Sequence, residues 1–297
     1  MPHVDANGLR IEYDERGSGE PLLLVMGLGS QMILWHDDFV DLLVERGFRV
    51  VRYDNRDIGG STHLDREKVP STGRVLAGLL SRRWAKAPYL LSDMAADGVG
   101  VLDALRIDQA HVMGASMGGM IAQTMAIDHP NRVASLTSIM SNTGDRRAGQ
   151  AKFSVLRRLA AGIRKRPADR IEAAVSTFRL ISGPHFSEDE ARLLAKRAVE
   201  RGDDEAGTGR QLAAIMASPN RTAGLRSLRV PTLVIHGMVD PLVKPSGGRA
   251  TATAVPGAEL LMFNDMGHDM PSVRWPAIAD AIRANANRAT KQPAPVA

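Results

Sequence analysis

Two different hydrophobic patterns lie near the start of the chain. Residues 9–16 alternate between apolar and polar side chains, whereas residues 22–26 are apolar at every position. Alternation with a period of two is typical of a strand exposed on one face, and a short continuous apolar run suits a strand buried on both faces. Because Gly17 and Gly19 end the first run, the pattern predicts a hairpin at the edge of a sheet there, and a buried strand further inside.

Strand-like and helical patterns alternate along the rest of the chain, on both sides of one interruption. Further strands are predicted at residues 48–53, 110–113, 133–140, 231–236 and 259–263, and helices at residues 37–46, 93–105, 117–128, 247–254 and 275–288. Such alternation is the signature of an α/β fold built on a mainly parallel sheet.

The interruption has helical periodicity but no convincing strand. Its helical stretches are predicted at residues 152–163, 168–180 and 188–200. We therefore expect a helical cap at residues 143–228, inserted into an α/β core made of residues 1–142 and 229–290. Residues 291–297 contain two prolines and are expected to be a flexible tail.

The composition restricts the chemistry that this fold can carry. The chain has 297 residues, of which 44% are hydrophobic and 24% charged, as in ordinary globular proteins, and it contains no cysteine. The absence of cysteine excludes a disulfide scaffold, a thiol nucleophile, a cysteine-ligated zinc and an iron–sulfur cluster. Any nucleophile must therefore be oxygen or nitrogen.

The formal net charge of +5 is unevenly distributed. Residues 146–229 hold 18 Lys and Arg against nine Asp and Glu, so this segment carries +9 and the rest of the chain −4. Together with Arg82 and Arg83, this segment either attracts acidic or amphiphilic substrates or an anionic membrane surface, or it is an ordinary solvated face. Nucleic-acid binding is disfavoured, because aromatic residues make up only 4% and no stacking platform or recognition helix is evident.

The chain shows no targeting or membrane-spanning pattern. Residues 1–9 lack the basic and apolar regions of a signal peptide, and no run approaches the roughly 18 apolar residues that cross a bilayer. We expect a cytoplasmic protein without a transmembrane segment.

The strongest local motif is Gly114-Ala115-Ser116-Met117-Gly118-Gly119, between a predicted strand and a predicted helix. It fits Gly-x-Ser-x-Gly, in which small residues allow a sharp, strained turn that presents the serine hydroxyl above the sheet. The motif is short, so tight strand–helix packing is the alternative explanation. A phosphate-binding loop is disfavoured, because neither Gly-Lys-Ser/Thr nor Gly-x-Gly-x-x-Gly is present.

A serine nucleophile needs a base and an acid that orients the base. His268 is the histidine that stands in a polar, glycine-bearing loop after a late strand, and Asp240 follows the end of the strand at 231–236. The order Ser116, Asp240, His268 is that of the hydrolase architecture in which this motif occurs. Asp265 and Asp269 are nearer to the histidine in sequence and are the less favoured alternatives for the acid.

The oxyanion of a tetrahedral intermediate needs hydrogen-bond donors, each of which contributes about 3–4 kcal/mol. We expect one donor to be the backbone N–H of Met117, which follows the serine at a helix N-terminus. We expect the second to be the N–H of Leu28, in the glycine-rich loop after the strand at 22–26.

Together these segments resemble the α/β-hydrolases, and within them the aclacinomycin methylesterases and related bacterial serine esterases. The motifs that carry the resemblance are Val25-Met26-Gly27-Leu28-Gly29, residues 52–61 (Arg-Tyr-Asp-Asn-Arg-Asp-Ile-Gly-Gly-Ser), residues 114–119, residues 231–235 (Pro-Thr-Leu-Val-Ile) and Met266-Gly267-His268. Many members have His-Gly where this chain has Met26-Gly27, which a backbone donor tolerates, and Gly60 stands where relatives often have arginine.

The resemblance implies a mostly parallel sheet of about eight strands flanked by helices, a helical cap, and no metal or organic cofactor. It implies hydrolysis of carboxylic esters through an acyl-enzyme. Serine at position 116 argues against the epoxide hydrolase and haloalkane dehalogenase relatives. Lactonase, thioesterase and cofactor-free haloperoxidase activities on the same triad stay open, as does a non-catalytic binding protein, which the presence of all three triad residues disfavours.

Substrate choice is expected to depend on the cap and its approaches. The expected partner is a small-molecule ester, lipid-like esters included, and the oligomeric state stays open between monomer and homodimer. Apolar residues at 75–91 either line a pocket or form a packed helix. Leu80, Trp84 and Met266 are our candidates for the pocket.

Overall fold

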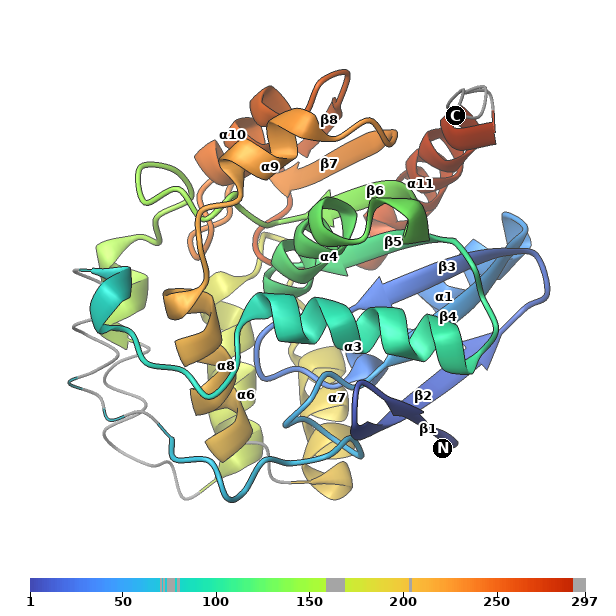
Figure 1. The fold of residues 1–297 in the computed structure, drawn as a ribbon. Helices are drawn as coiled ribbons and strands as arrows, with labels where there is room; N and C mark the ends of the chain where they lie inside the picture. Colours follow the sequence, from blue (N-terminus) through green and yellow to red (C-terminus); the bar gives the residue numbers. More distant parts are fainter. Residues whose placement is uncertain are drawn as a thin grey trace.

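The computed structural model describes residues 1–69, 71, 73, 78, 81–158, 169–202 and 205–290. In this part of the chain a sheet of eight strands, in the order β1-β2-β4-β3-β5-β6-β7-β8, runs through the centre of the molecule (Figure 1). The strands are β1 (His3–Ala6), β2 (Leu9–Arg16), β3 (Glu20–Val25), β4 (Phe48–Tyr53), β5 (Ala110–Ala115), β6 (Val133–Ile139), β7 (Thr232–Gly237) and β8 (Glu259–Phe263).

The sheet is mostly parallel, as predicted. From β4 through β3, β5, β6 and β7 to β8 all neighbours are parallel, and only the β1–β2 and β2–β4 pairs are antiparallel. The expected hairpin is at the sheet edge, but the prediction that it forms across Gly17 and Gly19 was wrong. The hairpin is formed by β1 and β2 around Asn7 and Gly8. Strand β3 takes no part in a hairpin, because it pairs in parallel with β4 and β5.

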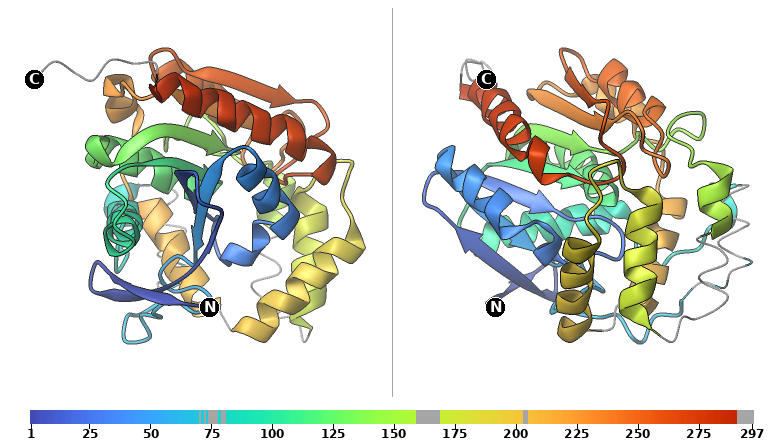
Figure 2. Two further views of the ribbon diagram at one scale, coloured as in Figure 1. Left: turned by 90° about the vertical axis from the view of Figure 1, so that its right-hand side faces the viewer. Right: turned by 180° about the vertical axis from the view of Figure 1, so that it is seen from behind.

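Helices cover both faces of the sheet (Figure 2). They are α1 (Asp37–Glu45), α3 (Leu91–Ala104), α4 (Met117–Asp128), α10 (Ser246–Ala254) and α11 (Trp275–Thr290), with short 3-10 turns η1 (Met32–Leu34), η2 (Arg82–Trp84), η3 (Pro130–Arg132) and η4 (Ser272–Arg274). In β3, Leu22 and Leu24 pack toward α1 and α11, while Leu23 and Val25 pack toward α3 and α4. This double burial explains why β3 is a continuous apolar run.

The interruption between β6 and β7 is helical, as predicted. Its described helices are α6 (Arg170–Ile181), α7 (Glu188–Arg201), α8 (Glu205–Ala217) and α9 (Thr222–Ser227), and residues 153–158 are helical too. Helices α6, α7 and α8 stand together at one end of the sheet (Figure 1). Short α9 packs on α4 and α10 of the core, and the division of the chain at residues 143 and 228 stays a prediction.

In the described residues, no helix is long and apolar enough to cross a membrane. The tail at 291–297 lies outside the described residues.

Candidate active site

Ser116 occupies a sharp turn between β5 and α4. Its backbone has φ of +56° and ψ of −118°, a conformation that costs a non-glycine residue about 1–3 kcal/mol. The turn is held by two backbone hydrogen bonds: Ser116 N–H donates to the Ile139 carbonyl on β6 (2.9 Å), and Met120 N–H donates to the Ser116 carbonyl (3.2 Å). Strand and helix together therefore fix the direction of the serine side chain.

The glycines of the motif are required by close backbone packing around this turn. A Cβ on Gly114 would collide with the backbone of Gly118, and a Cβ on Gly118 would collide with the Val25 carbonyl of β3. A Cβ on Gly119 would lie 2.7 Å from the Cβ of Ser141. The motif thus forms the sharp turn predicted at Ser116 and also serves tight strand–helix packing, while the role of Ser116 as a nucleophile stays a prediction.

The structure brings Ser116, His268 and Asp240 together, as the sequence predicted. His268 Nε2 lies 2.9 Å from Ser116 Oγ, and His268 Nδ1 lies 2.7 Å from Asp240 Oδ2. The three residues follow the carboxyl ends of β5, β7 and β8, which meet at one edge of the parallel sheet. With Nδ1–H donating to Asp240, Nε2 is free to accept the serine proton.

The carboxylate of Asp240 is fully buried and its position is fixed. Oδ1 accepts hydrogen bonds from the backbone N–H groups of Leu242 and Val243, both at 2.8 Å. A second imidazole stands close by: His236 Nε2 is 3.6 Å from Asp240 Oδ2 and donates to the Val243 carbonyl at 2.7 Å. Burial lowers the pKa of His236, so this ring is neutral and braces the turn that carries the aspartate.

The two alternative acids have other partners. Asp265 pairs with His185 and bidentately with Arg274. Asp269 accepts the backbone N–H groups of Gly267 (2.8 Å) and Gly183 (3.1 Å), and burial raises its pKa against the effect of these donors.

The histidine loop is anchored to the inserted helices. His268 N–H donates to the Ile181 carbonyl at the end of α6 (2.8 Å), and the Asp269 carboxylate binds the N–H of Gly183 just beyond it. Gly183 and Gly267 approach so closely that a Cβ on either would lie within 3 Å of backbone atoms of the other segment. The insertion therefore helps to hold His268 in place.

The proposed oxyanion donors lie beside the serine. A Cβ on Gly27 would be 3.3 Å from Ser116 Cβ and 3.9 Å from its Oγ, so the segment that continues into Leu28 borders the hydroxyl. In the described part of the chain, the N–H groups of Leu28 and Met117 have no hydrogen-bond partner. Both are thus available to a ligand atom near Ser116.

The insertion also holds residues 29–31, which follow the proposed oxyanion donor Leu28, through residues that the sequence did not indicate. Gln211 on α8 accepts the N–H of Gly29 (2.9 Å), and Gln31 donates to the Ala198 carbonyl of α7 (3.0 Å) while accepting from Arg201 (3.0 Å). Asn55 donates to the Met26 carbonyl from the core side (2.9 Å). These partners are far apart in sequence, so no local pattern could have revealed them.

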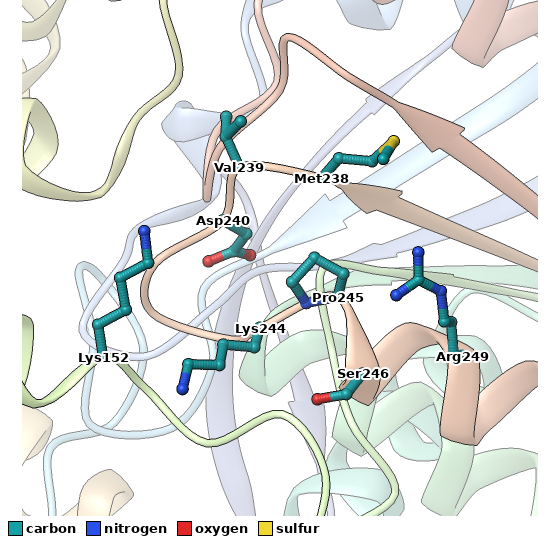
Figure 3. A pocket seen from close by; sticks show the side chains of 8 residues that line it. All are labelled: Lys152, Met238, Val239, Asp240, Lys244, Pro245, Ser246 and Arg249. Carbon is teal, nitrogen blue, oxygen red and sulfur yellow. The ribbon is translucent and has the colours of Figure 1, made fainter.

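The structure places the candidates for the substrate pocket in different surroundings. Trp84 is 59% exposed on η2, and Met266 is fully buried in the core packed against α11. That either of them lines a substrate pocket stays a prediction. Leu80 lies outside the described residues. A hollow of about 320 Å³ does border Asp240; its lining residues are Lys152, Met238, Val239, Asp240, Lys244, Pro245, Ser246 and Arg249 (Figure 3).

Within the described residues, no group of three or more His, Asp or Glu is arranged to hold a metal ion. The expectation that the protein uses neither metal nor organic cofactor stays a prediction.

Fold and site together define an α/β-hydrolase, and the comparison with protein families agrees: the chain belongs to the α/β-hydrolase fold family, whose model matches residues 20–273. Rhodomycin D methylesterase of Streptomyces peucetius is 30% identical to it, over 91% of this chain and 92% of that protein. The 2-hydroxymuconate semialdehyde hydrolase of Pseudomonas sp. strain CF600 is 26% identical, over 94% and 89%. The resemblance to methylesterases is thereby confirmed.

Solved structures support the same fold. The enol-lactonase from Burkholderia xenovorans LB400 has a TM-score of 0.71 and 24% identity, covering 98% of this chain and all of that one. An esterase from Thermogutta terrifontis has a TM-score of 0.74 and 20% identity, covering 97% and 99%. At these identities the likeness concerns the fold.

Proposed function

We propose that the protein is a serine hydrolase that cleaves carboxylic esters through an acyl-enzyme, with Ser116 as nucleophile, His268 as base and Asp240 as the acid that orients it. The observation that carries this proposal is the unbroken chain of contacts from Ser116 Oγ through both nitrogens of His268 to Asp240. The strained backbone at Ser116 supports it, because such strain is found where a side chain must be presented for chemistry.

The reaction follows from this geometry. His268 Nε2 takes the proton of Ser116 as Oγ attacks the ester carbonyl, and Asp240 stabilises the imidazolium that forms. The carbonyl oxygen becomes an oxyanion beside the N–H groups of Leu28 and Met117. His268 then returns the proton to the leaving alcohol, and a water activated by the same ring releases the acid from Ser116. Loss of either N–H contact at the transition state would cost about 3–4 kcal/mol.

The proposed substrate is a small-molecule ester, lipid-like esters included, in the cytoplasm. The methylesterase relative, at 30% identity over nearly the whole chain, supports an ester as substrate. Because one triad serves esters, lactones and thioesters alike, fold and triad alone do not select among them.

Hydrolysis of p-nitrophenyl butyrate by the wild type and by Ser116→Ala tests the proposal. We expect the variant to lose turnover and labelling by a fluorophosphonate probe, whereas Ser227→Ala, at an exposed serine of α9, keeps both. Equal turnover of Ser116→Ala and the wild type would refute the assignment. Turnover is then compared across esters of different acyl chain length, lactones and thioesters, and a peroxide-dependent halogenation assay tests the haloperoxidase alternative. The comparison shows which substrate class the enzyme prefers.

A further inference from the structure

Two segments far apart in the sequence lie side by side next to Asp240. Residues 146–158 follow β6, and residues 238–249 run from the end of β7 into α10. Lys152 N–H donates to the Pro241 carbonyl (2.8 Å), and Gly149 N–H donates to Ser246 Oγ (3.0 Å). Both segments line the hollow of Figure 3. We call these two segments together the basic face.

The basic face carries no exposed carboxylate of its own. Residues 146–158 include five Arg and Lys and no Asp or Glu, and residues 238–249 include two basic residues and the single acid Asp240. Asp240 is fully buried, with its oxygens bonded to His268 and to two backbone N–H groups. Asp145 borders the first segment and accepts the N–H of Arg147.

Three exposed cations surround the hollow. Lys152, Lys244 and Arg249 have no carboxylate within ion-pair distance in the described residues, so they offer uncompensated positive charge. In Figure 3, Lys152 and Lys244 lie to one side of Asp240 and Pro245, and Arg249 lies to the other. This spread suits an extended anionic surface better than a single small anion.

Apolar side chains are exposed on the same two segments. Phe153 is 79% exposed, more than any other large hydrophobic residue in the described part of the chain, and Leu156 is 46% exposed. On the second segment Met238 is 49% and Val239 43% exposed. Exposed apolar residues mark a contact surface where they gather, and here they stand on the two segments that also carry the positive charge.

We propose that the basic face docks on an anionic lipid bilayer. Lys152, Lys244 and Arg249 bind the headgroup phosphates, while Phe153, Leu156 and Met238 enter the boundary between headgroups and acyl chains. Binding at a membrane interface strengthens with the apolar area that is buried and with electrostatic attraction to anionic lipids, and this face offers the two together. Each basic residue near an anionic surface strengthens binding roughly fivefold. The proposal is independent of the ester hydrolysis proposed above.

The test is co-sedimentation of the full chain with vesicles of phosphatidylcholine alone or mixed with phosphatidylglycerol. We expect binding only to the anionic vesicles, weakened by added salt. The variant Lys152→Gln/Lys244→Gln/Arg249→Gln should bind them roughly a hundredfold more weakly, and Phe153→Ser/Leu156→Ser should dissociate more readily at equal salt. The matched control is Leu193→Ser/Lys196→Gln, which alters exposed residues of α7 and should bind like the wild type.

Several outcomes would overturn the proposal. One is absence of binding to the anionic vesicles; another is equal binding by the charge-neutralised variant. Binding of inorganic pyrophosphate without vesicle binding would assign the hollow to a small anion instead. If sedimentation shows a dimer of the wild type and a monomer of Phe153→Ser/Leu156→Ser, the face would instead bind a second copy of the chain. Unchanged p-nitrophenyl butyrate turnover and thermal unfolding without vesicles verify that each variant is folded.

Discussion

The side-chain oxygen of Gln211 on α8 accepts the backbone N–H of Gly29 at 2.9 Å, and its amide nitrogen donates to the Arg56 carbonyl, also at 2.9 Å. Gln211 is fully buried, and Gly29 has a φ of +64°, with Thr208 where a side chain would point. The amide therefore fixes the residue that follows Leu28, whose N–H we propose as an oxyanion donor. A helix of the insertion thus positions a loop of the core.

We expect Gln211→Ala to lower kcat for p-nitrophenyl butyrate by about 10- to 100-fold with a smaller change in KM, because a displaced oxyanion donor weakens the transition state more than the bound substrate. Stability should fall by about 1–3 kcal/mol, since two backbone groups lose their partners. Gln109→Ala, at an exposed amide, is the control. If Gln211→Ala lowered the free energy of unfolding but left kcat unchanged, Gln211 would have a structural role only.

Asp240→Asn tests the orienting acid. The side-chain oxygen of asparagine must still accept the N–H groups of Leu242 and Val243, so its NH₂ group faces His268 Nδ1. The imidazole then carries its proton on Nε2 and cannot take the serine proton. We expect kcat to fall about 10⁴-fold in a folded protein. Asp265→Asn should retain most activity, and the reverse ranking of the two variants would reassign the acid.

Gly118→Ala tests the packing of the serine turn. The added methyl group collides with the Val25 carbonyl, which belongs to the central strand β3 and cannot move aside. We expect unfolding in urea to show a loss of about 3 kcal/mol or more. Gly73→Ala is the matched control, because its Cβ would meet nothing within 4 Å and its φ is not in the left-handed region. Equal stability of the two variants would contradict the close approach.

His111 on β5 predicts a pH dependence of stability. Burial lowers its pKa to about 4, with Glu20 opposing the shift and Arg283 adding to it. The unfolded chain binds this proton near pH 6.5, so the contribution of neutral His111 is full above pH 6.5 and is lost as pH falls toward 4. Its full size is about 3 kcal/mol. Urea unfolding at several pH values should therefore show that the free energy of unfolding falls less steeply toward acid pH in His111→Gln than in the wild type.

Much of the sheet and its flanking helices could be predicted from the sequence, because local signals bound these elements. The predicted helix at 117–128 and the strands at 48–53 and 259–263 agree with the structure residue for residue. Strand β1 was not predicted, because it has only four residues and pairs only with β2. Helix α8 was not predicted, because Gly207 and Gly209 interrupt its periodicity; a Cβ on Gly207 would collide with the Asp57 carbonyl.

The residues of the candidate triad could be predicted because each stands after a recognisable strand, and a parallel sheet gathers such strand ends. The residues that position them could not. Gln211 contacts Gly29 across 182 residues of chain, and Asp269 contacts Gly183 across 86. Only the folded arrangement of α6, α7 and α8 against the sheet reveals these contacts.

A buried ion pair joins α8 to the core and supports the last prediction. Arg210 binds both oxygens of Asp57 (2.6 and 2.9 Å), and the same carboxylate accepts from Tyr89 and from Leu64 N–H. Both charged side chains are buried.

Replacing Arg210 by methionine leaves the Asp57 carboxylate buried without its cation, which should cost about 3–5 kcal/mol in urea unfolding. Adding Asp57→Asn removes the stranded charge, so the double variant should recover part of that loss. Arg192→Met breaks an exposed pair with Glu172 and Glu188 and should cost far less. If Arg210→Met were no less stable than Arg192→Met, the pair would contribute nothing to holding α8 against the sheet.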